Sequence, residues 1–123
     1  MNRYLIVLFG GGVGSVARYI VGTQIAQRVG LRFPPLGTMV INITGSFLIG
    51  LLMTLLTQRL ASPNWRLLLV VGFLGGYTTF SSFEYETLQA VQGGVIWMGL
   101  LNVVGSVVLG YLAVWIGVAL VRQ

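Results

Sequence analysis

The residues that could do chemistry in this sequence are few, and most of them gather in the segment Gly72–Glu86. Two adjacent glycines there are followed by a run of hydroxyl side chains, two phenylalanines and the only two acidic residues, Glu84 and Glu86. The sequence contains no His, Cys, Asp or Lys. Zinc and iron sites need His, Cys or clustered carboxylates, so a catalytic metal centre is implausible and we expect no enzyme. Any chemistry must therefore rest on hydroxyls, amides, aromatic rings and the backbone.

The elements that carry these residues are long apolar segments. Hydrophobic residues make up 56% of the 123 residues and charged residues only 7%, whereas a soluble domain has about 25% charged residues. A helix of about 20 apolar residues crosses the hydrocarbon core of a bilayer. The sequence therefore predicts an all-α membrane protein with four transmembrane helices, which form one domain over 1–123. The four segments span roughly 4–26, 36–57, 67–91 and 95–121.

Seven arginines give the chain a net charge of +5. They are dispersed beside the apolar segments, which favours contact with lipid headgroups, so we expect a bilayer and no nucleic acid as partner. Four spans put both termini and the second connection on one side of the membrane. That side carries four arginines and the other side two: Arg3, Arg59, Arg66 and Arg122 against Arg28 and Arg32. So weak an asymmetry leaves open one orientation, with the termini inside, or insertion in both orientations.

Small and polar residues recur inside the spans. Most of the 18 glycines lie there, among them Gly10 and Gly14 in a G-x-x-x-G pattern, and we expect most of them to serve close helix packing. The segments Asn42–Gly50 and Asn102–Gly110 resemble one another, and in each a Ser follows the Asn by four residues. Asn and Ser then share a helix face, where they either hydrogen-bond between helices or line a pore.

Arg18 lies well inside the first span, about 22 Å along a helix from Arg3. No acidic residue of the first two spans can pair with it. Three roles remain open on the sequence alone. The side chain could snorkel to the far interface beside Tyr19, cap backbone carbonyls, or raise the potential for an anion.

The third span predicts an interruption. Two glycines followed by Tyr77, Thr78 and Thr79 make poor helix, so we expect a break near Gly75–Thr79. Irregular backbone at membrane depth persists only where it is buried or lines a cavity, and broken helices expose carbonyls that can hold a small cation. A mere kink is the alternative.

Beyond the break, a resumed helix would place Phe80 and Phe83 on one face, and Glu86 would continue that stripe. Aromatic rings have positive edges, so edge-on rings could favour an anion, although packing is the ordinary role of such a pair. We expect Glu84 and Glu86, near the end of the span, to be solvated.

Together these motifs resemble those of the CrcB/Fluc family of bacterial fluoride channels along essentially the whole chain. The matching segments are Gly11–Tyr19, Asn42–Phe47 and, most specifically, Gly72–Phe83. The resemblance implies an antiparallel, dual-topology homodimer with two pores in the bacterial inner membrane, which exports fluoride passively and so reduces its toxicity. It also implies a third helix broken mid-membrane that crosses its inverted copy at the dimer centre.

The resemblance further implies a structural, non-transported sodium ion held there by the backbone carbonyls of Gly75 and Thr78. It places the anion pathway along five side chains: Asn42, Phe80, Ser81, Ser82 and Phe83. Apart from the resemblance, Thr79 is a weaker candidate. Family members often carry Thr where Ser82 stands, and the hydroxyl is kept. From the residues themselves we add Ser106, Arg18 and, more weakly, Asn102 and Glu86.

Two other classes of protein compete with a channel. A small proton-coupled antiporter needs an acid at mid-membrane, and here both acids lie late in the third span, so only Glu86 supports that class. A non-transporting scaffold subunit would use every polar residue for helix contacts.

Overall fold

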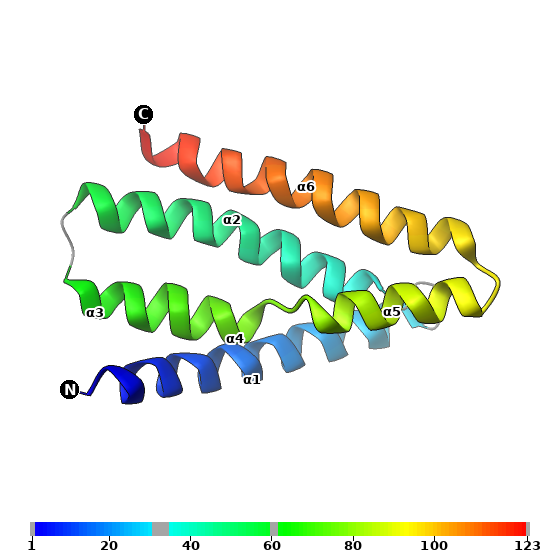
Figure 1. Cartoon of the computed structure of the whole chain (residues 1–123), viewed down its shortest axis with the longest axis horizontal. Coiled ribbons are helices and arrows are strands. Elements are labelled where there is room, and N and C mark those ends of the chain that lie inside the picture. The colour runs from blue at the N-terminus through cyan, green and yellow to red at the C-terminus, as the bar shows by residue number, and fades with distance from the viewer. Residues whose placement is uncertain (1, 31–34, 60–61, 123) are drawn as a thin grey trace.

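The computed structural model describes residues 2–30, 35–59 and 62–122, and all the regular secondary structure in this part is helical (Figure 1). The elements in chain order are α1 (Arg3–Val29), α2 (Leu36–Gln58), α3 (Pro63–Trp65), the π-helix η2 (Arg66–Leu74), α4 (Gly75–Tyr77), α5 (Ser81–Gln92) and α6 (Ile96–Arg122). Arg32, assigned from the sequence to the membrane side opposite the termini, lies outside the described residues.

Four segments of the described chain are long and apolar enough to cross a membrane: Arg3–Val29, Leu36–Gln58, Pro63–Gln92 and Ile96–Arg122. This confirms the prediction of four spans in a multi-pass membrane protein. The ends of the helices lie within about one turn of those expected from the sequence, which is the ordinary uncertainty of a helix boundary.

The helices pack as two pairs, and the interrupted third span contacts both of them. The most extensive contact joins α2 to α6, which run in the same direction, and the next joins α1 to η2 (Figure 1). The first half of the third span therefore packs on α1, whereas its second half, α5, packs on α6. The interruption allows one span to change its packing partner halfway across the bundle.

Close approach of the helices depends on glycine. A Cβ atom added at Gly14 would overlap the carbonyl oxygen of Phe73, and one added at Gly76 would overlap that of Gly11. Across the other pair, a Cβ at Gly50 would meet the carbonyl oxygen of Val114. The predicted packing role of the glycines is confirmed at these positions, because small residues allow the backbones of membrane helices to touch.

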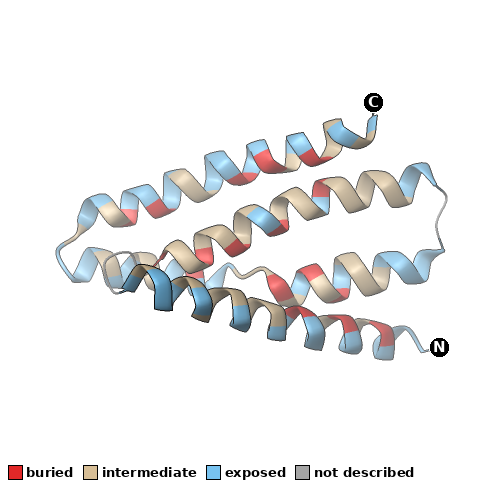
Figure 2. Cartoon of the chain, turned by 180° about the vertical axis from the view of Figure 1, so that it is seen from behind, coloured by how far each residue is buried: buried red, intermediate tan, exposed pale blue. Residues whose placement is uncertain are grey.

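The buried residues lie on the faces that the helices turn toward one another (Figure 2). Few apolar side chains are buried in the described part of the chain, among them Ile6, Ile41, Leu74 and Tyr77. The outer faces of α1 and α6 are lined with exposed large hydrophobic side chains, for example Phe9 and Trp115. Such faces suit lipid or another membrane-embedded chain rather than water.

The third span is interrupted at Thr78–Phe80, which confirms the predicted break but moves it. Gly75–Tyr77 still forms a helical turn, and the backbone becomes extended at Thr78, with φ −83° and ψ 159°. The glycine pair is therefore the last turn before the break. The π-helix that precedes it was not predicted; π-helical turns often lie beside functional sites.

Candidate functional site

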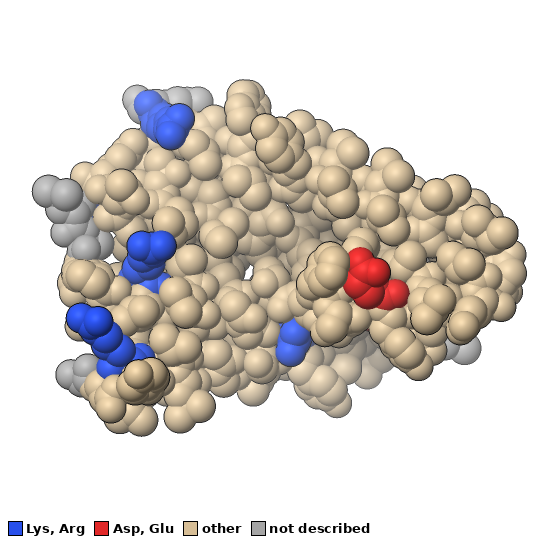
Figure 3. All heavy atoms as spheres, in the orientation of Figure 1, with Lys and Arg blue, Asp and Glu red and all other residues tan. Residues whose placement is uncertain are grey.

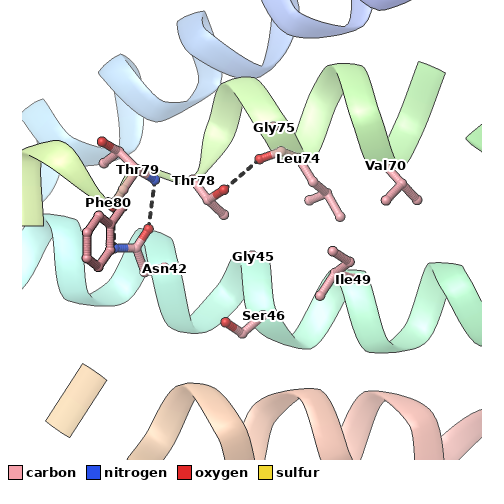
Figure 4. A pocket seen from close by; sticks show the side chains of 10 residues that line it. All are labelled: Asn42, Gly45, Ser46, Ile49, Val70, Leu74, Gly75, Thr78, Thr79 and Phe80. Atoms are coloured by element: carbon pink, nitrogen blue, oxygen red, sulfur yellow. Dashed lines mark hydrogen bonds between the residues drawn. The ribbon is translucent and has the colours of Figure 1, made fainter. Parts of the chain in front are cut away.

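The break is held open by Asn42 of α2, which binds both backbone groups of Thr79 (Figure 4). Its Nδ2 donates to the carbonyl oxygen of Thr79 at 2.8 Å, and its Oδ1 accepts from the Thr79 N–H at 2.9 Å. In a continuous α-helix that N–H would donate to the carbonyl of Gly75. Asn42 thus takes the place of a helical hydrogen bond and leaves the Gly75 carbonyl without its usual donor.

The two residues before Thr79 are held in a similar way. Nη1 of Arg18 donates to the carbonyl oxygen of Thr78 at 3.2 Å, so of the roles open to Arg18 the structure contains the carbonyl cap. The hydroxyls of Thr44 and Tyr77 lie 2.9 Å apart. Three successive residues of the third span are therefore bound by side chains of α1 and α2, and we call Arg18, Asn42 and Thr44 the break lock.

A hollow of about 550 Å³, open on one side, lies between α2 and the break (Figure 4). Its lining combines polar groups with aliphatic side chains: Asn42, Gly45, Ser46, Ile49, Val70, Leu74, Gly75, Thr78, Thr79 and Phe80. Asn42 and Ser46 both face it, as their spacing on one helix face predicts. The hollow therefore brings an amide, three hydroxyl-bearing residues and one aromatic residue to the interrupted backbone.

Phe80 and Phe83 lie together, with ring centroids 5.8 Å apart and ring planes tilted by 38°. Their surroundings differ. Phe80 is 73% exposed and lines the hollow, whereas Phe83 is 7% exposed and belongs to the core of the protomer. Only the ring of Phe80 is accessible from the hollow.

The hydroxyl of Thr79, within the break, binds the first turn of the resumed helix α5. Thr79 Oγ1 accepts from the Ser82 N–H at 3.3 Å and donates to Ser82 Oγ at 3.2 Å. A side-chain oxygen that accepts from a backbone N–H three residues later is a common N-cap arrangement. The structure thus gives Thr79 a local structural role, and Ser81 and Ser82 are exposed.

A second set of polar side chains forms hydrogen bonds inside the protomer, where α5 packs against α6. Asn102 is buried, and its Nδ2 donates to Thr87 Oγ1 at 2.9 Å. Thr87 Oγ1 in turn donates to the carbonyl oxygen of Phe83 at 2.8 Å, and Ser106 Oγ donates to Asn102 Oδ1 at 3.4 Å. Of the two roles open to this pair, Asn102 displays interhelical hydrogen bonding, whereas Ser106 bonds to Asn102 within α6.

The environment of Glu86 differs from the solvated one that we expected from the sequence. Glu84 is exposed, as expected, but Glu86 is half-buried, and its Oε1 accepts from Thr38 Oγ1 at 2.7 Å. Its Oε2 is buried and has no hydrogen-bond partner in the described part of the chain. The expectation of a solvated Glu86 is wrong because α5 packs against α6 and also touches α2. Thr38, four residues before Asn42 on the same helix face, is a polar site residue that we did not predict.

No group of three or more His, Cys, Asp or Glu side chains in the described residues could hold a metal ion. A cation at the break would therefore need backbone oxygens, which are ligands of the type that hard cations prefer. Gly75 and Thr78 both line the hollow, and the Gly75 carbonyl has lost its helical donor. The Thr78 carbonyl accepts from Arg18 and keeps a second lone pair.

The fold and this site define a class of protein: a small multi-pass membrane protein whose third helix is interrupted beside a polar hollow. Residues 5–118 match the family described as "CrcB-like protein, Camphor Resistance (CrcB)". The chain is 64% identical to the fluoride-specific ion channel FluC of Solibacter usitatus, over 98% of this chain and 99% of that one. The proteins of the same name from Acidobacterium capsulatum and Rhizobium meliloti are 53% and 47% identical, over at least 92% of each chain compared. The chain belongs to the CrcB-like family, which confirms the resemblance inferred from its motifs.

Proposed function

We propose that the protein is a fluoride-selective ion channel that exports fluoride passively and so lowers its toxicity to the cell. One observation carries the proposal: the chain is 64% identical, over 98% of its length, to a protein named a fluoride-specific ion channel. The polar hollow beside the interrupted helix is consistent with it. The activity is conduction rather than catalysis, and we assign the chain to the cytoplasmic membrane of a bacterium, because the relatives come from bacteria.

Fluoride is small and strongly hydrated, so a pathway must replace its water with hydrogen-bond donors. Asn42 carries two amide N–H groups; one binds Thr79, and the other is left to meet an anion. Ser81 and Ser82 add hydroxyl donors, and the hydroxyl of Ser106 would add a third if it released Asn102. Each contact is individually weak, as conduction requires.

Aromatic and electrostatic contributions complete the pathway. Phe80 offers a positive ring edge on the side of the hollow, and Phe83 lies directly behind it. The charge of Arg18, although it is bonded to Thr78, makes the potential near the break more favourable for an anion.

The channel is proposed to work as an antiparallel, dual-topology homodimer. The hollow opens to the surface and the interrupted backbone lines it, so a second copy of the chain could close it. Figure 3 shows arginines gathered towards the end of the bundle that carries the termini. In an inverted pair, each side of the membrane receives the arginine-rich end of one copy and the opposite end of the other copy. The pair as a whole then has the same arginine content on both sides, so charge asymmetry favours neither orientation of the dimer.

A structural sodium ion is proposed at the centre of this dimer. The carbonyls of Gly75 and Thr78 from each copy would hold it, and its charge would offset the mutual repulsion of oxygen dipoles brought face to face. The ion belongs to the scaffold and does not travel with fluoride.

Efflux from proteoliposomes tests the proposal against its two alternatives. Vesicles loaded with potassium fluoride are diluted into fluoride-free buffer, and external fluoride is followed with a fluoride electrode. A channel gives rapid efflux only when a potassium ionophore supplies the counter-current. Efflux that needs a proton gradient would indicate an antiporter, in which Glu86 would be the coupling acid, and no efflux would indicate a scaffold subunit. Empty vesicles and a chloride-loaded set are the controls.

A further inference from the structure

Glu84 lies on the exposed side of α5, in the first turn of that helix. It follows Phe80 by four residues and Ser81 by three, spacings that place side chains next to one another on a helix surface. Phe80 and Ser81 are exposed as well. The carboxylate therefore lies one helical turn beyond the exposed phenylalanine, on the face that presents expected residues of the anion pathway.

The charge of this carboxylate is not neutralised within the described part of the chain, where Glu84 forms no ion pair. The cation of the neighbouring region, Arg18, is directed at the carbonyl of Thr78. The other acid, Glu86, points inward and binds Thr38. The position of Glu84 at the start of a helix favours a negative charge, since the helix dipole is positive there.

A carboxylate is costly in hydrocarbon, and Glu84 belongs to the membrane-capable segment Pro63–Gln92. Figure 3 shows acidic side-chain atoms at the molecular surface, away from the end of the bundle where most of the arginines gather. The first turn of α5 therefore suits a water-filled entrance better than lipid.

We propose that Glu84 is a rate-determining charge at the entrance of the anion pathway. Its carboxylate repels anions that approach Phe80 and offsets the attraction exerted by Arg18. Charges lining an entrance set the local concentration of the permeant ion, and therefore the rate at which it arrives. The proposal rests on the proposed function, because it needs a conducting anion pathway.

The first test compares efflux through wild type, Glu84→Gln and Glu84→Asp at two ionic strengths set with an impermeant salt. At about 10 mM the Debye length is ~30 Å, and at about 1 M it is ~3 Å, so a single charge acts strongly in the first case and weakly in the second. We expect Glu84→Gln to conduct several-fold faster than wild type at low ionic strength and at the same rate at high ionic strength. Glu84→Asp keeps the charge and should match wild type in both.

A second test changes the charge after the protein has assembled. The chain has no cysteine, so Glu84→Cys introduces a unique thiol that can be labelled with a sulfonate-bearing or a trimethylammonium-bearing methanethiosulfonate. Because both labels are applied to the same assembled channel, a difference in folding cannot explain a difference in flux. The cationic label should raise fluoride flux at low ionic strength, and the anionic label should return it to the wild-type rate.

Several results would overturn the proposal. Equal flux for wild type and Glu84→Gln at low ionic strength, slower flux for Glu84→Gln, equal effects of the two labels, or a thiol that water-soluble reagents cannot reach would each remove Glu84 from the entrance. Failure of the proposed function looks different: wild type itself would release no fluoride.

Discussion

Asn42 and Thr79, which lie 37 residues apart in the chain, bind each other twice: the amide of one occupies the N–H and the carbonyl of the other. The pair stabilises an interruption that a continuous helix would otherwise close, and Asn42 also lines the hollow beside it. The same side chain thus shapes the break and belongs to the proposed pathway.

Replacing Asn42 by Ala should therefore damage structure and conduction together. The variant leaves both backbone groups of Thr79 unpaired, and each half-buried group left so costs about 1–3 kcal/mol. We expect a lower melting temperature and strongly reduced fluoride efflux. Asn64→Ala, at an exposed position in the α3 turn, is the matched control and should change neither quantity. A fully stable, fully active Asn42→Ala variant would argue against the break lock.

Phe80→Ile should suppress fluoride flux, because Ile has no positive ring edge to offer. Phe83→Ile should suppress it too, because the Phe80 ring loses the aromatic ring that it packs against. Their effects on stability should differ, since Phe80 is 73% exposed and Phe83 is 7% exposed. A core substitution that changes side-chain shape costs more than one at an open position. Flux assays paired with thermal unfolding in detergent separate the two effects. Unchanged flux in both variants would refute a role for the rings.

Gly14→Ala should destabilise the bundle, because the new Cβ would overlap the carbonyl oxygen of Phe73 and force α1 away from the third span. Overpacking of this type typically costs about 1–3 kcal/mol. Gly12→Ala is the control: it lies on the same helix, and no atom lies within 4 Å of its added Cβ. The free energy of unfolding of the two variants should therefore diverge, and equal values would contradict the observed packing of α1.

Asn102→Val should loosen the contact between α5 and α6. The substitution removes the donor to Thr87 and the acceptor for Ser106. Hydrogen bonds between membrane helices contribute about 0.6 kcal/mol on average and up to about 2 kcal/mol. Hydrogen exchange of α5 amides, measured by mass spectrometry, should accelerate in the variant. Ser15→Ala, on the exposed side of α1, should leave that exchange unchanged.

Removal of sodium should lower the stability of the assembled channel if the carbonyls of Gly75 and Thr78 hold that ion. Binding to the folded state alone stabilises it by RT ln(1 + [L]/Kd), so the melting temperature should rise with sodium concentration. N-methylglucamine at equal ionic strength is the control, because it is too large for a site made of carbonyls. A melting temperature that is the same in sodium and in N-methylglucamine would exclude the structural sodium.

The sequence alone determined the features that depend on local composition and spacing. Apolar runs of sufficient length predicted four spans, and the pair Gly75 and Gly76 followed by β-branched residues predicted an interrupted third one. The spacing of Phe80 and Phe83 predicted adjacent rings. Each of these follows from residues close together in the chain, whose propensities and periodicity do not depend on distant partners.

Tertiary structure alone decided where the break falls and what surrounds it. The interruption lies at Thr78–Phe80 rather than at the glycines because Asn42 and Arg18, on other helices, bind the backbone there. Glu86 is half-buried and accepts a hydrogen bond from Thr38, whereas Glu84, two residues earlier, is exposed. Which side chain meets which backbone group depends on how α1 and α2 pack against the third span. That arrangement joins residues up to 60 positions apart, so no local pattern reveals it.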